Sequence, residues 1–162
     1  WTSSTPAGGA SILCVKILII KSASVLLDDA DYERIAAFTG YYLGKGYLMR
    51  DIKTRVGRIK MRLEWDIVGV PPIGLMVDHK DRNPLNNQRD NLRYCTQAQN
   101  NRNRASWSKH GRKGVFRTGS RWGAQICFKG KKKQLGWFAT VDEAGNAYAI
   151  AATHYYGEFV CF

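Results

Sequence analysis

The sequence predicts an α+β protein built from two modules that follow one another along the chain. Short runs of β-branched and apolar residues alternate with polar turns over most of the first 105 residues. A stretch rich in Ser, Gly and Lys, residues 106–112, then interrupts this pattern. Beyond it, residues 114–117, 122–129 and 133–138 have the composition of short strands separated by glycine-containing turns, and a helix begins at Asp142. The second module is therefore expected to contain three short strands followed by one helix.

Local patterns predict the elements of the first module. Residues 1–11 are rich in Ser, Thr, Gly and Ala and are expected to form a loose tail. β-branched residues predict strands over 12–20 and 24–27. The Asp-rich stretch that follows offers an N-cap for a helix over 32–37. Further strands are expected over residues 41–50 and 59–67. A short apolar run, residues 75–77, leads into Asp78-His79, and a polar loop over 80–90 leads to residues 91–95. Thr96 is a candidate cap for a short helix over 97–104.

Positive charge is concentrated in one part of the chain. The whole chain carries 25 Lys and Arg residues against 13 Asp and Glu, a formal net charge of +12. Residues 80–133 contain fifteen of these bases and only two acids, so this stretch alone has a balance of +13. Such a concentration is typical of a protein that binds a polyanion.

Nucleic acid fits this charge better than a membrane surface does. No apolar run reaches the ~18 residues that span a bilayer, and no basic amphipathic helix accompanies the charge. The four cysteines are scattered and form no Cys-x-x-Cys pair, which disfavours a thiolate zinc site and a disulfide framework. We therefore expect an intracellular protein that binds nucleic acid and no membrane.

One group of residues has the composition of a phosphodiesterase site. His79 precedes Asn91 by 12 residues, and Asn91 precedes Asn100 by nine. These residues and Asp78 would converge if Asp78-His79 ends one strand, Asn91 begins the next and Asn100 lies on the helix. Asp78 and Asn100 offer the oxygen ligands that a hard divalent cation prefers. His79 suits a general base near neutral pH, and Asn91 could fix its tautomer.

A purely structural interpretation of the same residues stays open at this point. Asp-His is a common dipeptide, and Asn-rich stretches such as 83–91 often form turns. From composition alone, His79 is more often a structural histidine than a catalyst.

The stretch from Val77 to Asn103 resembles, without gaps, the HNH endonuclease family in its homing-endonuclease branch. The matching residues are Val77-Asp78-His79-Lys80-Asp81, Pro84-Leu85-Asn86-Asn87, Asp90-Asn91-Leu92-Arg93, Thr96 and Gln99-Asn100-Asn101-Arg102-Asn103. The resemblance extends upstream to residues 25–32. It implies a ββα-metal nuclease that cuts DNA, with His79 as general base and Asn91 orienting the histidine. It also implies Asp78 and Asn100 as ligands of one Mg²⁺ or Mn²⁺.

The chain departs from this family in one respect. Relatives usually carry a His-Arg pair in the strand before the proline loop. Here that region is Met61-Arg62-Leu63-Glu64-Trp65, and no histidine precedes His79. The missing pair lies outside the metal-and-base set, so its absence bears on how DNA is positioned.

The second module resembles the ethylene-response-factor (APETALA-two) DNA-binding domain. The matching segments are Lys113-Gly114-Val115, Trp122-Gly123-Ala124-Gln125-Ile126, Leu135-Gly136-Trp137-Phe138, Glu143-Ala144, Ala147-Tyr148 and Tyr156-Gly157-Glu158-Phe159. Domains of this family lay a three-stranded antiparallel sheet, packed on one helix, in the major groove of DNA. The resemblance therefore implies this fold for the second module.

The resemblance implies which residues face DNA. On the sheet they are Lys113, Arg117, Arg121, Trp122, Gln125, Lys129, Lys131, Lys132, Lys133 and Gln134; in the first module we add Arg93, Arg102 and Arg104. Phe116, Thr118 and Cys127 replace arginines of the plant domains, which indicates a different or looser base code. At least one of Trp122 and Trp137 is expected to pack in the core instead of contacting bases.

The predicted organisation is a tail over 1–11, an HNH nuclease module with a β-rich N-terminal segment over 12–105, a linker over 106–112 and an ethylene-response-factor-type domain over 113–162. The predicted function is metal-dependent cutting of double-stranded DNA, most simply a nick, with one Mg²⁺ or Mn²⁺ per site and no small-molecule cofactor. A monomer or weak dimer is expected, in the cytoplasm of a bacterial or phage-infected host or in an organelle. The alternative is a non-catalytic, nuclease-derived nucleic-acid-binding protein.

Overall fold

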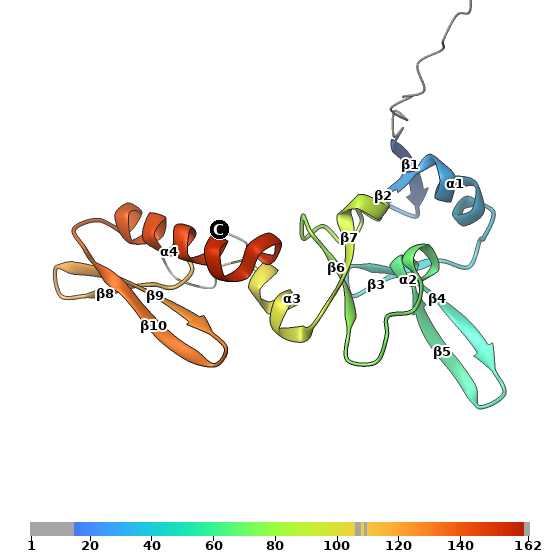
Figure 1. Cartoon of the computed structure of the whole chain (residues 1–162). Coiled ribbons are helices and arrows are strands. Elements are labelled where there is room, and N and C mark those ends of the chain that lie inside the picture. Colours follow the sequence, from blue (N-terminus) through green and yellow to red (C-terminus); the bar gives the residue numbers. More distant parts are fainter. Residues whose placement is uncertain (1–14, 106–107, 109, 161–162) are drawn as a thin grey trace, which may run out of the picture. The chain divides into compact units, whose positions relative to one another are not determined.

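The computed structural model describes residues 15–105, 108 and 110–160. By its internal contacts the chain divides into two compact units. The first contains the residues up to 71 together with 83–93, and the second contains 72–82 and the residues from 94 onward (Figure 1). The tail expected over 1–11 and part of the expected linker lie outside the described residues.

In the first unit a hairpin leads directly into a helix. Strands β1 (Val15–Ile20) and β2 (Ala23–Asp28) pair antiparallel, and α1 (Asp29–Ala36) begins at the next residue. Val25 and Leu27 of β2 and Ile35 of α1 are fully buried and form the core of this part. Both strands and the helix expected here are therefore present.

A loop from further along the chain is attached to this hairpin. The Leu26 amide donates to the Leu85 carbonyl oxygen at 2.8 Å, and the Asn87 amide donates to the Leu26 carbonyl oxygen at 2.9 Å. The loop then ends in a short 3-10 helix, η1 (Arg89–Asn91). Backbone pairing thus fixes residues 85–87 beside β2.

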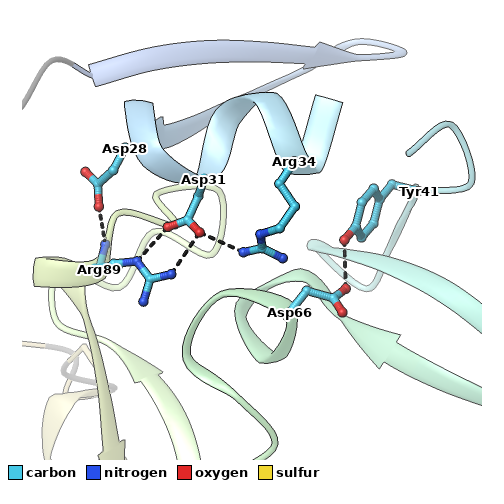
Figure 2. Close-up of polar contacts among 6 residues, drawn as sticks. All are labelled: Asp28, Asp31, Arg34, Tyr41, Asp66 and Arg89. Atoms are coloured by element: carbon cyan, nitrogen blue, oxygen red, sulfur yellow. Dashed lines mark hydrogen bonds and ion pairs between the residues drawn. The ribbon is translucent and has the colours of Figure 1, made fainter. Parts of the chain in front are cut away.

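Two buried carboxylates bind the end of this loop (Figure 2). Asp28 accepts the Arg89 backbone N–H at 2.8 Å. Asp31 accepts Nε and Nη2 of Arg89 at 2.7 and 2.9 Å, and Nη2 of Arg34 at 2.7 Å. Burial raises the pKa of the Asp31 carboxyl group, but the hydrogen bonds from Arg89 and Arg34 outweigh it and bring the pKa below its usual value. Asp31 is therefore held ionised inside the unit.

The middle of the first unit differs from the sequence prediction in two places. The strand expected over 41–50 is a hairpin of β3 (Tyr42–Gly44) and β4 (Tyr47–Thr54), because Lys45 and Gly46 adopt positive φ angles of 54° and 83° and reverse the chain. The strand expected over 59–67 ends early. Strand β5 (Gly57–Arg62) pairs with β4, and α2 (Leu63–Val68) follows it.

The burial of its side chains explains why α2 is a helix and not a continuation of β5. Leu63, Glu64 and Ile67 are buried, and Leu63 and Ile67 are four residues apart, which places them on one helical face. Asp66 of the same helix accepts two hydrogen bonds from Arg50 at 2.6 and 2.8 Å and one from Tyr41 at 2.7 Å. These bonds hold α2 against β4.

The second unit begins with short elements. Strand β6 (Met76–His79) pairs with β7 (Leu92–Cys95), whose last two residues belong to this unit. Helix α3 (Gln97–Asn103) starts with a capping box, in which the side chains of Thr96 and Gln99 bond each other's backbone N–H groups. The predicted Thr96 cap is confirmed.

The second unit ends in the sheet and helix that the sequence predicts. Strands β8 (Val115–Thr118), β9 (Arg121–Phe128) and β10 (Lys131–Phe138) form an antiparallel sheet in the order β10-β9-β8. Helix α4 (Val141–Tyr156) and a 3-10 turn, η2 (Gly157–Phe159), follow. Val115, Ala124 and Ala144 form the buried centre between sheet and helix, where small side chains let α4 approach closely. The predicted α+β class and this architecture are confirmed.

No helix among the described residues is both long and apolar enough to cross a membrane.

The Asp31 contacts lead to a stability prediction. We expect Asp31→Asn to lower the free energy of unfolding at pH 7 by about 1.5–3 kcal/mol, because the amide cannot replace a carboxylate that binds two guanidinium groups. The pKa of Asp31 is lower in the folded state, so its contribution is present above the unfolded-state pKa of about 4 and disappears as the pH falls through the folded-state pKa. Thermal or urea unfolding of both proteins between pH 7 and pH 2.5 measures this.

Asp29→Asn is the matched control, because Asp29 lies on the same helix with a half-exposed side chain that faces Lys16 at 3.8 Å. It should change stability by a few tenths of a kcal/mol, as expected for a surface ion pair. A difference between wild type and Asp31→Asn that does not shrink in acid would contradict the assignment.

Candidate active site

The candidate site starts at the end of β6, where two titratable side chains are buried. Asp78 and His79 are only 6% and 5% exposed. Charged and polar groups are rarely buried to this extent unless hydrogen bonds compensate for the lost water. The contacts around these two residues therefore define the site.

One side chain of α3 reaches both residues. The Asn103 amide nitrogen donates to both carboxylate oxygens of Asp78 at 3.1 Å, and to the backbone carbonyl oxygen of His79 at 2.8 Å. Asn103 itself is 3% exposed. A single buried amide thus ties the last turn of α3 to the end of β6.

Asn100, the ligand implied by the resemblance, lies one turn earlier on the same helix. Asn103 follows Asn100 by three positions, so both side chains lie on one face of α3. Its amide nitrogen lies 3.0 Å from the Met76 sulfur of β6. The structure therefore brings Asn100 to the same strand as Asp78, and Asn103 to Asp78 itself.

The carboxylate and the two amides have the chemistry of a hard-cation site. Asp78 supplies anionic oxygens, and a half-turn of the Asn100 amide about its Cβ–Cγ bond would present its oxygen in place of its nitrogen. The residues present therefore fit Mg²⁺ or Mn²⁺ held by few protein ligands. Within the described part of the chain, no three His, Cys, Asp or Glu side chains are grouped so that they could hold a metal ion.

Asn91 lies in the first unit, at the end of η1. Its side-chain amide donates to the Asn86 carbonyl oxygen at 2.7 Å. The loop that carries it is held by Asp28 and by the backbone of β2. Its role in orienting His79 stays a prediction.

Several basic residues predicted to bind DNA make contacts within the second unit. The Arg102 guanidinium lies over the Tyr156 ring, 4.6 Å from its centre, and Lys113 donates to the Arg102 carbonyl oxygen at 2.5 Å. Arg104 is exposed just after α3, and Arg93 is half-buried on β7. Arg102 and Lys113 therefore help to join α3 to the C-terminal sheet and helix.

The sheet separates the remaining predicted DNA contacts onto two faces. We call the face packed on α4 the helix-side face and the opposite one the outer face. Residues directly opposite one another in neighbouring strands share a face. The pairing of strands places Arg121, Gln125, Lys132 and Gln134 on the outer face, and Arg117, Trp122, Lys131 and Lys133 on the helix-side face.

Contacts of the helix-side residues agree with this assignment. Trp122 packs against the buried centre of the module, and the Arg117 guanidinium lies 5.6 Å from the centre of its ring. Lys133 donates to the Tyr155 hydroxyl of α4 at 2.8 Å. Lys129 occupies the turn between β9 and β10, with a φ angle of 50°. At least one of Trp122 and Trp137 was expected to pack in the core, and Trp122 does so.

Sequence reasoning missed Asn103 as a site residue. The spacing argument selected Asn100 as the metal ligand and stopped there. Helical geometry held the missing information, because a residue three positions after Asn100 must share its face of α3.

Comparison with known proteins supports part of this interpretation. The family model for HNH endonucleases matches residues 62–102, so this stretch is similar to HNH endonuclease domains. A protein of Acanthamoeba polyphaga mimivirus, named an uncharacterized HNH endonuclease, is 32% identical over 120 residues, which are 74% of this chain. The chain spans 58% of the length of that relative. No solved structure matches the chain.

The family match contains the predicted site residues but neither Asn103 nor the C-terminal sheet. It includes Asp78, His79, Asn91 and Asn100 and ends at residue 102. The resemblance of residues 113–162 to the ethylene-response-factor domain therefore stays a prediction.

The Asn103 contacts lead to a second prediction. We expect Asn103→Ala to lower the free energy of unfolding by about 1–3 kcal/mol, because it removes hydrogen bonds from a buried carboxylate and a buried carbonyl. Amide hydrogen exchange over residues 76–79 should accelerate, since β6 loses its link to α3. Asn101→Ala is the matched control, because Asn101 is an exposed asparagine of the same helix. Equal effects of the two substitutions would contradict a specific role of Asn103.

Proposed function

We propose that this chain is a metal-dependent DNA endonuclease of the homing type, which hydrolyses one phosphodiester at its single HNH site and so nicks its target. One observation carries the proposal. Asp78 and His79 are adjacent and buried at the end of β6, and one amide of α3 binds the Asp78 carboxylate at 3.1 Å and the His79 backbone carbonyl oxygen at 2.8 Å. Asp78 and His79 lie within the stretch that matches HNH endonucleases.

His79 is the proposed general base. A neutral imidazole can take a proton from the water that attacks phosphorus, at a pH near neutrality. The hydrogen bond from Asn103 to the His79 carbonyl oxygen holds the backbone that carries the imidazole ring. Orienting the histidine remains the role proposed for Asn91.

Asp78 and Asn100 are the residues proposed to hold one Mg²⁺ or Mn²⁺. When bound there, the cation stabilises negative charge on the phosphate and on the departing oxygen. Asn103 does not need to bind the cation to contribute. By donating to both oxygens of Asp78 it fixes the carboxylate in one orientation.

Double-stranded DNA is the proposed substrate and binding partner. The chain carries +12, and between Asp90 and Asp142 it contains no acidic residue at all. A phosphate backbone is the polyanion that such a stretch would neutralise, with release of its counterions. We propose that the C-terminal sheet supplies much of this affinity. The chain is proposed to act as a monomer or weak dimer.

The test of the nuclease proposal is plasmid cleavage. We expect supercoiled DNA to become open-circular with Mg²⁺ or Mn²⁺ and to stay supercoiled in EDTA. His79→Ala should reduce the rate at least 100-fold, as expected for loss of a general base. His154→Ala is the matched control, because it removes an exposed histidine of α4 and should leave cleavage unchanged.

Each other result has a definite meaning. Linear product at early times would contradict nicking and indicate paired sites. Cleavage that His79→Ala leaves intact would overturn the assignment of the base. Tight DNA binding without any metal-dependent product, tested on a pool of DNA sequences, would favour the non-catalytic binding protein.

Salt dependence tests the binding proposal. We expect the logarithm of the affinity for a duplex to fall linearly with the logarithm of salt concentration, with a slope of roughly −4 for about four or five neutralised phosphates. Lys132→Ala should make the slope shallower by about 1. Lys16→Ala should not change it, because Lys16 already faces Glu33 at 3.3 Å and Asp29 at 3.8 Å. A flat response to salt would contradict the proposal.

A further inference from the structure

The outer face of the C-terminal sheet carries an aromatic pair at its centre. Phe116 of β8 and Trp137 of β10 both lie opposite Gly123 of β9. Their rings meet edge to face with centres 5.6 Å apart. A Cβ on Gly123 would lie 2.5 Å from the Phe116 ring, so only glycine leaves room for this pair.

This aromatic pair is open to solvent and is not part of the core. Trp137 is 50% exposed, although a tryptophan of a small sheet normally gains stability by burial. The buried centre of the module lies on the other face, with Trp122 and α4. An exposed aromatic pair on a sheet is typical of a binding surface.

Two glutamines lie beside the pair. Gln125 and Gln134 are directly opposite one another on β9 and β10. Neighbouring strands are ~4.8 Å apart, so the two amides project side by side from the outer face. The Gln134 amide nitrogen donates to the Gly136 carbonyl oxygen at 3.0 Å, along the irregularity in β10 that brings Trp137 into register with Gly123.

The charge of this face identifies the class of partner. Arg121 and Lys132 are exposed on it, and none of its residues is acidic. A partner that complements it must be anionic and must offer apolar and amide-binding groups at the same place. The major groove of duplex DNA has all three, because thymine presents a methyl group and adenine presents N6 and N7 between two phosphate backbones.

We propose that the outer face reads A·T base pairs in the major groove. Gln125 and Gln134 bind adenine through N6 and N7, and the Phe116–Trp137 pair contacts thymine C5-methyl groups. Arg121 and Lys132 contact the flanking phosphates. This inference rests on the proposed function, since it assumes that the chain binds duplex DNA through this sheet.

Base composition at the bound site is the first test. The wild-type chain in EDTA is used to select duplexes from a pool with a randomised segment, at moderate salt. We expect two or more consecutive A·T pairs to be enriched in the bound fraction. Replacing an adenine that contacts a glutamine by another base should weaken binding by roughly 5- to 100-fold.

A change of the two glutamines should change the base that is selected. Arginine binds guanine O6 and N7 in the way that glutamine binds adenine, so Gln125→Arg with Gln134→Arg should shift the enriched pairs from A·T to G·C. Asn146→Arg with Thr153→Arg adds the same charge at exposed positions of α4. This control should raise overall affinity at most and keep the A·T preference.

Replacing thymine by uracil tests the aromatic contact alone, because uracil lacks only the methyl group. On the selected duplex we expect about fourfold weaker binding for each contacted methyl. Phe116→Ala and Trp137→Ala should bind the thymine and uracil duplexes equally. Near-equal circular dichroism spectra of variants and wild type would show that these differences do not come from unfolding.

The outcomes separate this inference from the proposal on which it rests. Salt-dependent binding with no base preference, or a preference for G·C pairs in the wild type, would overturn the A·T assignment and leave DNA binding intact. A preference for single strands over duplexes would also overturn it. Absence of any DNA binding would overturn both.

Discussion

The candidate site depends on one buried hydrogen-bonding group, the amide of Asn103. Burying a carboxylate until it is 6% exposed costs several kcal/mol of hydration free energy, unless protein donors replace the lost water. Asn103 supplies such a donor to Asp78 and, with the same nitrogen, fixes the backbone of His79. The proposed metal ligand and the proposed base are thereby positioned together. The capping box of Thr96 and Gln99 sets the start of α3 and so the direction in which Asn103 projects.

The first unit uses a similar device at a second place. Asp31 is 1% exposed and binds Arg34 from its own helix and Arg89 from a loop 58 residues away in the chain. Removing either partner from a buried pair of this kind costs more than the pair itself contributes, because a charge is left behind. The arrangement therefore favours one conformation of the loop strongly. That loop carries Asn91, so a structural ion pair fixes a residue to which the sequence assigns a catalytic role.

The sequence predicted the elements whose local patterns were unambiguous, and failed where two patterns overlapped. Strands β8, β9 and β10 and helix α4 were predictable from turns, strand composition and a stripe of alanines. Leu63 and Ile67 fit strand alternation and helical spacing equally well, and tertiary burial of α2 decided between them. At the site, spacing identified Asp78 and Asn100, but only the packed helix reveals that Asn103 is the residue bound to Asp78. The sequence also placed Lys131, Lys132 and Lys133 together on one surface, which a strand does not allow, because successive side chains alternate between its faces.

Cutting and sequence reading have different physical requirements, and the proposed function assigns them to different elements of this chain. The phosphodiester is the same at every base step, so His79 and Asp78 can supply chemistry but no preference for a sequence. Preference requires contact with base edges, and phosphate contacts by lysine and arginine do not provide it. Among the proposed DNA-binding surfaces, the outer face of the β8–β10 sheet combines paired amides with exposed rings, which are groups that discriminate between bases. The choice of target is therefore expected to follow the few side chains of this face, whereas β6 and α3 carry the residues proposed to cut the strand.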